Sequence, residues 1–225
     1  MATPEERFTF ESGTARGPVT GAWADPGRAA AALVVAPGAG SDLDAPFLVG
    51  FTRALNDAGI ATMRFNFPYK ESGRKAPDPE ATLRATWLAA FDAAAERAGA
   101  GVPVFAGGKS MGGRHASMCA ADGMAAAGLV FLGYPLHAPG RPEKVRDAHL
   151  YGIEAPMLFI EGTRDPFVTP LDQLEGILAK LGDRAVLHEI PGGDHSFRVK
   201  GQKRDDREIG AELAPVAADF MRAHR

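Results

Sequence analysis

The sequence predicts an α/β fold, with a mostly parallel central sheet covered by helices on both faces. Short apolar runs recur along the 225 residues, and stretches with helical periodicity separate them. Such alternation is typical of parallel strands joined by crossover helices. Polar segments rich in glycine and proline, Pro68–Pro79 and Pro135–Arg146, follow predicted strands and do not divide the chain. We therefore expect one domain over residues 1–225, without a separate lid.

About eight strands are expected. Two weaker candidates near the N-terminus, Phe8–Glu11 and Val19–Ala24, are predicted to form an antiparallel pair at one edge of the sheet. The apolar runs that predict the other strands are Leu33–Ala36, Ile60–Phe65, Val102–Ala106, Leu129–Leu132, Met157–Glu161 and Ala185–Ile190.

Helices between the strands are marked by apolar stripes and by their ends. The stripes consist of Phe47, Leu48, Phe51 and Leu55, of Leu83, Trp87, Leu88 and Phe91, of Leu174, Ile177, Leu178 and Leu181, and of Ile209, Leu213, Val216 and Phe220. Gly59 and Gly99 stand where a glycine commonly ends a helix. Thr169 is predicted to cap the third of these helices, with Pro170 in its first turn. Pro215 is a candidate kink in the last one.

Composition and charge exclude several classes of protein. Lys and Arg total 25 and Asp and Glu 28, so the net charge is −3, and the absence of a basic cluster argues against nucleic-acid binding. Cys119 is the only cysteine, which excludes an intramolecular disulfide and a zinc site built on paired cysteines. The N-terminus lacks the apolar segment of a signal peptide, and the apolar run 29–36 is too short to span a bilayer. We expect a cytoplasmic protein without membrane contact, as a monomer or small homo-oligomer.

The clearest chemical motif is a G-x-S-x-G sequence formed by Gly108, Ser110 and Gly112. It lies between an apolar strand and a helix-compatible run, and that context is typical of a nucleophile elbow. Glycines prevent side-chain collisions in the tight turn, which lifts the serine oxygen above the sheet. The backbone N–H of Met111 then lies at a helix N-terminus, where it would stabilise negative charge on a substrate oxygen.

An aspartate and a histidine follow two later strands. Asp165 lies beyond Met157–Glu161, and His195 lies beyond Ala185–Ile190. The order Ser, Asp, His is that of α/β-hydrolases, and active sites of open α/β sheets lie at the C-terminal ends of the strands. Asp194 is a competing acid, although its position beside His195 makes contact with the imidazole ring awkward.

The loop after the first parallel strand is predicted to supply the second oxyanion donor. The segment Pro37-Gly38-Ala39-Gly40 lets the backbone come close to a substrate and turn an N–H toward it. Ala39 is the first candidate for this donor, with Gly38 and Gly40 as alternatives.

Four residues are candidates for the substrate pocket: Gly38, Tyr69, Lys109 and His137. Lys109 either attracts an anionic substrate or pairs with a neighbouring acid. Lys70, Arg74 and Arg141 are three further candidates for the walls of the pocket, although the simpler interpretation is that they are solvent-exposed loop residues.

Together these motifs resemble the α/β-hydrolase superfamily over almost the whole chain. Within it, the segments 37–40, 64–69, 108–114 and 134–137 are similar to a group of compact, lidless proteins related to dienelactone hydrolases. That group includes the testis-expressed hydrolase-like proteins and the hydrolase-like domain of a chromatin-complex subunit. The resemblance implies an α/β-hydrolase fold with Ser110 as nucleophile, Asp165 as acid and His195 as base.

Two departures from the family pattern affect what the resemblance implies. Pro37 stands where lipases and esterases carry the histidine of their oxyanion motif. Ser110 stands where dienelactone hydrolases proper use cysteine, so dienelactones are not the expected substrate.

We therefore expect a serine hydrolase that cleaves an ester, thioester or similar acyl bond of a small substrate. The chemistry requires no cofactor and no metal. The alternative is a catalytically silent binding or scaffold protein with the same fold, and a third interpretation is acyl transfer to an acceptor other than water. The presence of Ser110, Asp165 and His195 together favours the hydrolase.

Overall fold

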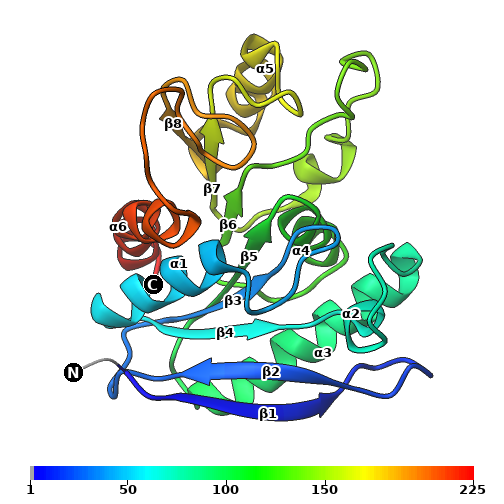
Figure 1. The fold of residues 1–225 in the computed structure, drawn as a ribbon, viewed down its shortest axis with the longest axis vertical. Coiled ribbons are helices and arrows are strands. Elements are labelled where there is room, and N and C mark those ends of the chain that lie inside the picture. The colour runs from blue at the N-terminus through cyan, green and yellow to red at the C-terminus, as the bar shows by residue number, and fades with distance from the viewer. Residues whose placement is uncertain (1–2) are drawn as a thin grey trace.

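A computed structural model describes residues 3–225 and contains a central sheet of eight strands. The strands follow the order β1-β2-β4-β3-β5-β6-β7-β8, from β1 at the bottom of Figure 1 to β8 near the top. The pairs β1–β2 and β2–β4 are antiparallel, and the other pairs are parallel. The predicted class, with its antiparallel pair at one edge, is confirmed.

The strands are short, and the central ones are almost entirely buried. Their bounds are Glu5–Glu11 (β1), Pro18–Ala24 (β2), Ala32–Ala36 (β3), Ala61–Phe65 (β4), Val104–Lys109 (β5), Leu129–Leu132 (β6), Met157–Gly162 (β7) and Ala185–Ile190 (β8). Strands β3 to β7 are covered on both faces, which explains why β3 and β6 are continuous apolar runs. Strand β4 is the exception, because Thr62 and Arg64 alternate with its apolar residues and are buried with hydrogen-bond partners.

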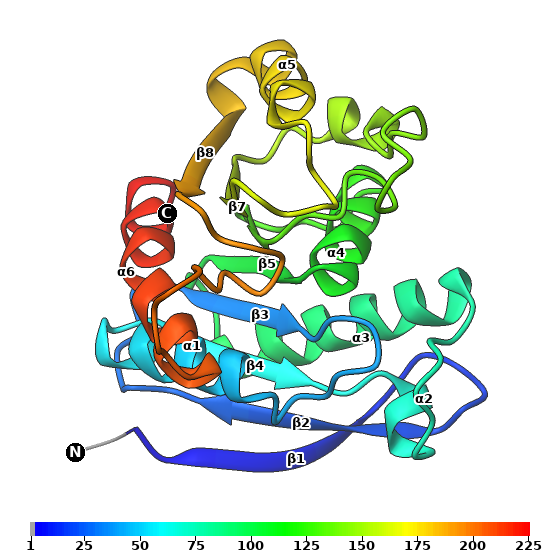
Figure 2. The same ribbon diagram turned by 45° about the horizontal axis from the view of Figure 1, so that its top comes forward.

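Helices cover both faces of the sheet, as Figure 2 shows. Their bounds are Pro46–Asp57 (α1), Pro68–Glu71 (α2), Glu80–Ala98 (α3), Met111–Ala121 (α4), Leu171–Leu181 (α5) and Asp206–Ala223 (α6). One apolar core joins the sheet to α3, α4 and α5, and a second core joins the opposite face to α1 and α6. Within residues 3–225, no helix has the length and apolarity needed to cross a membrane.

Helices α1 and α6 cross at very short distance because each contributes a glycine to the crossing. A Cβ on Gly50 would lie 2.0 Å from the carbonyl oxygen of Arg207, and a Cβ on Gly210 would lie 2.0 Å from that of Phe47. Neither position has room for a side chain. The crossing brings the N-terminal turns of both helices to the edge of the sheet where β3 and β5 end, and these turns line the cleft described below.

Several local predictions were wrong. Pro68–Glu71 forms the short helix α2, where a loop was expected. Thr169 does not cap α5: the cap position belongs to Pro170, and the Thr169 hydroxyl donates instead to the carbonyl oxygen of Asp165. Leu88 is 42% exposed and does not belong to the buried face of α3.

The last helix contains a proline and begins with a cap that was not predicted from the sequence. Helix α6 continues through Pro215 and does not end there. Its start is fixed by a capping box, in which the Asp205 side chain accepts from the Glu208 N–H and the Glu208 side chain accepts from the Asp205 N–H. This reciprocal pair satisfies two N–H groups that would otherwise lack partners at the helix end.

Candidate active site

Ser110 occupies a sharp turn between β5 and α4. Its backbone has φ 51° and ψ −115°, a left-handed conformation that non-glycine residues rarely adopt. Glycine neighbours allow the turn: a Cβ on Gly108 or on Gly112 would lie 2.5 Å from the Ala36 carbonyl oxygen. The Trp87 indole N–H donates to the Gly112 carbonyl oxygen over 2.9 Å and holds the start of α4. The local geometry is that of the predicted nucleophile elbow.

Ser110, His195 and Asp165 form a continuous hydrogen-bonded chain. His195 Nε2 lies 2.9 Å from the Ser110 hydroxyl oxygen, and His195 Nδ1 lies 2.5 Å from Asp165 Oδ2. The three residues follow three different strands. Ser110 lies 85 residues and Asp165 lies 30 residues before His195 in the sequence, and the fold brings the three side chains together. A serine whose hydroxyl faces an imidazole, itself oriented by a carboxylate, can be activated as a nucleophile.

Asp165 is fully buried, and its second carboxylate oxygen accepts the backbone N–H of Phe167 over 2.8 Å. Asp194, the competing acid, has a different role, because its Oδ1 accepts the backbone N–H groups of Ser196 and Arg198. Asp194 therefore shapes the histidine loop, and Asp165 is the carboxylate in contact with the ring.

The loop after β3 presents backbone N–H groups beside Ser110. A Cβ on Gly38 would lie 3.8 Å from the Ser110 Cβ, so the two backbones approach closely. The Gly40 N–H is engaged, because it donates to the Tyr69 hydroxyl oxygen over 3.1 Å. Ala39 and Gly38 remain as oxyanion-donor candidates from this loop. Met111 is the first residue of α4, where a backbone N–H has no acceptor within its helix.

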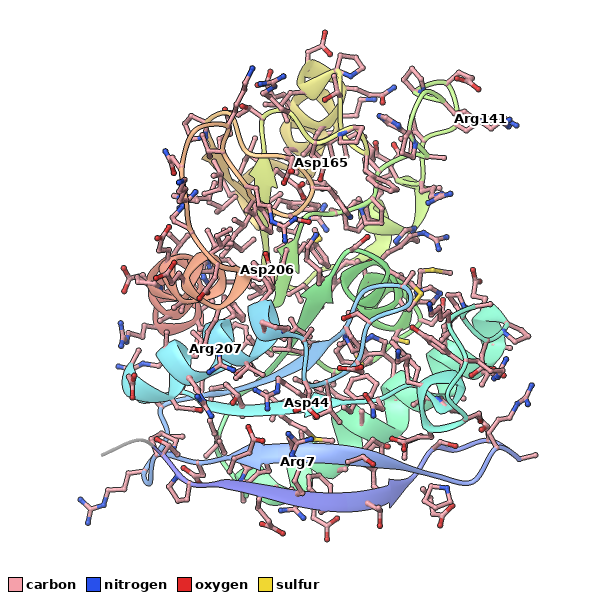
Figure 3. All side chains as sticks on the ribbon, viewed as in Figure 1. Arg7, Asp44, Arg141, Asp165, Asp206 and Arg207 are labelled. Atoms are coloured by element: carbon pink, nitrogen blue, oxygen red, sulfur yellow. The ribbon has the colours of Figure 1, made fainter. Side chains whose placement is uncertain are left out.

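A cleft of about 630 Å³ opens over these groups. Its walls are residues 38–42, the N-terminal turn of α1 (44–48), Lys109, Ser110, Phe167, His195, Ser196 and Asp206. The three outer carboxylates are paired: Asp42 binds Lys70, Asp44 binds Arg7 of β1, and Asp206 binds Arg198. Figure 3 shows Asp44 beside Arg7 and Asp206 at the start of α6.

Comparison with known proteins identifies the family. A profile described as an alpha/beta hydrolase domain matches residues 29–223. The chain belongs to the alpha/beta hydrolase family. The expected family is therefore confirmed, while the narrower resemblance to the testis-expressed proteins is not specifically shown.

Solved structures of dienelactone hydrolase-like proteins share the fold of this hydrolase. The dienelactone hydrolase of Anabaena variabilis is 20% identical, with a TM-score of 0.76 over 100% of this chain and 99% of that chain. An α/β serine hydrolase without a lid from Xanthomonas campestris is 20% identical, with a TM-score of 0.73 over 98% and 96%. A dienelactone hydrolase-like promiscuous phosphotriesterase from metagenomic libraries is 17% identical, with a TM-score of 0.68 over 99% and 98%. At these identities the likeness shows the fold.

Two residues predicted for the substrate pocket of this hydrolase do not line the cleft. Tyr69 is fully buried, and its hydroxyl is used by Gly40, so it supports the oxyanion loop from behind. His137 is also fully buried, and its Nδ1 lies 3.0 Å from the Ala138 carbonyl oxygen. Both expectations are corrected, because helix α2 after β4 and the loop after β6 place these side chains in the protein interior and away from the cleft.

The other pocket candidates divide between the cleft and its surroundings. Gly38 and Lys109 line the cleft. Lys70 does not, because its ammonium donates to the Gly40 carbonyl oxygen over 3.0 Å. Arg74 pairs with the buried Asp78, and Arg141 lies on an outer loop away from Asp165 in Figure 3.

Glu161, a fully buried acid at the end of β7, is not among the residues predicted for the site. Its Oε1 accepts the Tyr134 backbone N–H over 2.5 Å, and its Oε2 has no hydrogen-bond partner among the described residues. Burial raises the pKa of this carboxyl well above its usual range. A carboxylate at the end of an otherwise apolar strand was the available signal.

Lys109 directly precedes Ser110, and its charge lies near this buried acid. Its ammonium donates to the His195 carbonyl oxygen over 2.5 Å. Burial lowers the lysine pKa from 10.5 to about 8, against the attraction of Asp165, Glu161 and Asp194. Within residues 3–225, no three His, Cys, Asp or Glu side chains are grouped so that they could hold a metal ion.

Proposed function

We propose that this α/β hydrolase is a serine hydrolase that cleaves an ester, thioester or related acyl bond of a small substrate. One observation carries the proposal: Ser110, His195 and Asp165 are joined by hydrogen bonds of 2.9 and 2.5 Å at the floor of an open cleft. The volume of that cleft, about 630 Å³, suits a small molecule.

In the first half of the reaction, Ser110 Oγ attacks the carbonyl carbon while His195 Nε2 takes the hydroxyl proton. Asp165 holds the imidazole with its proton on Nδ1 and stabilises the imidazolium. The carbonyl oxygen becomes an oxyanion, for which we propose the backbone N–H groups of Ala39 and Met111 as donors. Each such donor contributes on the order of 3 kcal/mol of transition-state stabilisation.

In the second half, the leaving group takes the proton from His195 and departs, leaving an acyl ester on Ser110. Water enters the open cleft, His195 removes its proton, and the resulting hydroxide adds to the acyl carbon. The bond from that carbon to Ser110 Oγ then breaks, the oxygen takes the proton back from His195, and the acid is released. Every proton in this sequence moves through one imidazole, so no further reactant is required.

Labelling with a fluorophosphonate probe tests the proposal, because the probe reacts with activated serines. We expect the wild type to be labelled and Ser110→Ala and His195→Ala to lose labelling. Ser41→Ala is the matched control, since Ser41 lines the same cleft and no hydrogen bond joins it to His195. Hydrolysis of p-nitrophenyl acetate and of an acetyl thioester should fall by up to about 10⁶-fold in Ser110→Ala.

Two results would contradict the proposed function. Labelling that persists in Ser110→Ala would assign the reactive group elsewhere. A folded wild type that is neither labelled nor active on the two substrates would contradict the proposal and favour a silent binding protein.

A further inference from the structure

Lys109 connects the strand that carries the nucleophile to the loop that carries the base. It is the last residue of β5 and directly precedes Ser110. Its ammonium reaches the main-chain carbonyl oxygen of His195, 86 residues later, at 2.5 Å. The bond therefore fixes the histidine backbone relative to the turn that holds the serine.

The surroundings of the ammonium are enclosed and acidic. Three acids attract the cation: Glu161 of β7, Asp165 after β7 and Asp194 before His195. The group that accepts its hydrogen bond is the uncharged carbonyl of His195. A Cβ on Gly133, at the end of β6, would lie 2.9 Å from Nζ, so the space beside it has no room for another side chain. The Phe197 ring lies on a further side, with its centroid 5.2 Å from Nζ.

The histidine loop supports the same arrangement from its own side. Phe197 is buried, adopts φ 62° and stacks on Phe47 with ring centroids 5.6 Å apart. Gly193 and Asp194 pack on the backbone of Gly162, where a Cβ would lie 2.4 Å from the Gly193 carbonyl oxygen. These contacts fix the two ends of the loop. Among the described residues, Lys109 is the only one whose side chain forms a hydrogen bond with the main chain of His195.

We propose that Lys109 is a positioning residue for the reaction, which ties the His195 loop to the nucleophile strand and so sets the alignment of Nε2 on the serine oxygen. The inference rests on the proposed serine-hydrolase function. It also argues against the idea that Lys109 recruits an anionic substrate, because its ammonium is bonded to the main-chain carbonyl oxygen of His195. The histidine is the acid–base group, and Lys109 acts through it.

Steady-state kinetics of Lys109→Met test the proposal with two substrates that share a leaving group, p-nitrophenyl acetate and mono-p-nitrophenyl succinate. Loss of a hydrogen bond from a charged donor should lower kcat about 10- to 100-fold for both esters, with KM changed less than about 3-fold. Lys180→Met, an exposed lysine on α5, is the control for loss of charge and should leave both constants unchanged.

Chemical rescue separates positioning from folding. Lys109→Cys treated with 2-bromoethylamine regains an amine of nearly the original length, whereas treatment with 1-iodopropane gives the same length without the amine. We expect the aminoethyl form to recover kcat to within about 5-fold of wild type and the propyl form to remain as low as Lys109→Met. Cys119 is buried and should react little in the parent protein, which serves as the control.

Proton NMR gives a readout independent of turnover. The Nδ1 proton shared by His195 and Asp165 should resonate far downfield in the wild type and in the aminoethyl form, and be shifted or broadened in the propyl form. This measurement decides the inference even if the wild type shows no hydrolysis, an outcome that would contradict the proposed function alone.

Three results would overturn the inference. Unchanged kcat and an unchanged downfield resonance in Lys109→Met would show that the bond does not align the histidine. A rise in KM confined to the succinate ester would make Lys109 a substrate-binding residue. Equal activity of the aminoethyl and propyl forms would mean that only the length of the side chain matters.

Discussion

The two sides of the candidate site are held in place by different kinds of contact. On the nucleophile side, β3, β5 and α4 meet backbone to backbone, and a Cβ on Gly112 would lie 2.5 Å from the Ala36 carbonyl oxygen and 2.7 Å from that of Pro37. On the acid–base side, the loops after β7 and β8 are held by side chains: Asp165 bonds the ring of His195, and Lys109 bonds its backbone.

This difference indicates how each side responds to change. Backbone packing depends on shape, so the nucleophile side should be insensitive to pH and intolerant of added atoms. Contacts between buried charges depend on protonation, so the acid–base side should respond to pH and to isosteric changes of charge. Substitutions that keep the shape and alter only the charge or a single hydrogen bond can therefore distinguish the two sides.

Among substitutions that keep the shape of the site, the largest effect is expected for Asp165→Asn, which breaks the acid–base side. The amide presents a donor to His195 and favours the wrong imidazole tautomer, so kcat should fall about 10³- to 10⁴-fold. Asp194→Asn is the matched control, because its Oδ1 can still accept the N–H groups of Ser196 and Arg198. We expect it to stay within about 3-fold of wild type in the same ester assay, and equal losses in both variants would contradict the assignment of the acid.

A smaller effect is expected in the pH dependence of stability, through Lys109. Its pKa is about 8 in the folded protein against an ordinary value of 10.5, so between these values the unfolded chain binds more protons. The free energy of unfolding of wild type, relative to Lys109→Met, should therefore rise with pH from about 8 to 10.5, by at most about 3 kcal/mol. Urea denaturation of both proteins at pH 7.5, 8.5 and 9.5 measures it, and a difference that stays constant over this range would show that the ammonium is not destabilised by burial.

The smallest effect is expected on the nucleophile side, for Tyr69→Phe. The substitution keeps the buried ring and removes only the hydroxyl oxygen that accepts the Gly40 N–H. We expect kcat to fall about 3- to 10-fold and the free energy of unfolding by about 1 kcal/mol, with an unchanged pH profile. Tyr151→Phe, which removes a hydroxyl bonded to Asp147 at the surface, should change neither quantity. A larger loss of kcat for Tyr69→Phe than for Lys109→Met would contradict the expectation that the acid–base side is more sensitive than the nucleophile side to the loss of a single hydrogen bond.

The nucleophile side could be predicted from the sequence because its contacts are local and need glycine. The apolar run 102–106, the glycines at 108 and 112 and the following helical run are neighbours in the chain. The left-handed Ser110 is a consequence of the turn between them. The order of Ser110, Asp165 and His195 along the strands likewise follows from the alternation of strands and helices.

The surroundings of the site could not be predicted in the same way. Tyr69 and His137 follow strands whose C-terminal ends face the cleft, so sequence position alone made them pocket candidates. In the structure, Tyr69 lies on helix α2 and His137 on a loop, and both side chains are buried. Lys109 left two interpretations open, a substrate anchor or an acid partner, and in the structure it bonds a main-chain carbonyl oxygen. The pattern around Glu161 predicts only the end of a strand, and its burial beside the site depends on how β6 and β7 pair.

The sequence by itself determined the fold class, the family and the residues able to form a serine-hydrolase triad, because the succession of strands and helices along the chain, the glycine positions and the residue types are local properties. Only the tertiary structure decided where the ammonium of Lys109 points, which N–H groups of the oxyanion loop are free and which pocket candidates are buried. Those outcomes depend on contacts between segments up to 86 residues apart, where a shift of a few ångströms changes the partner of a polar side chain.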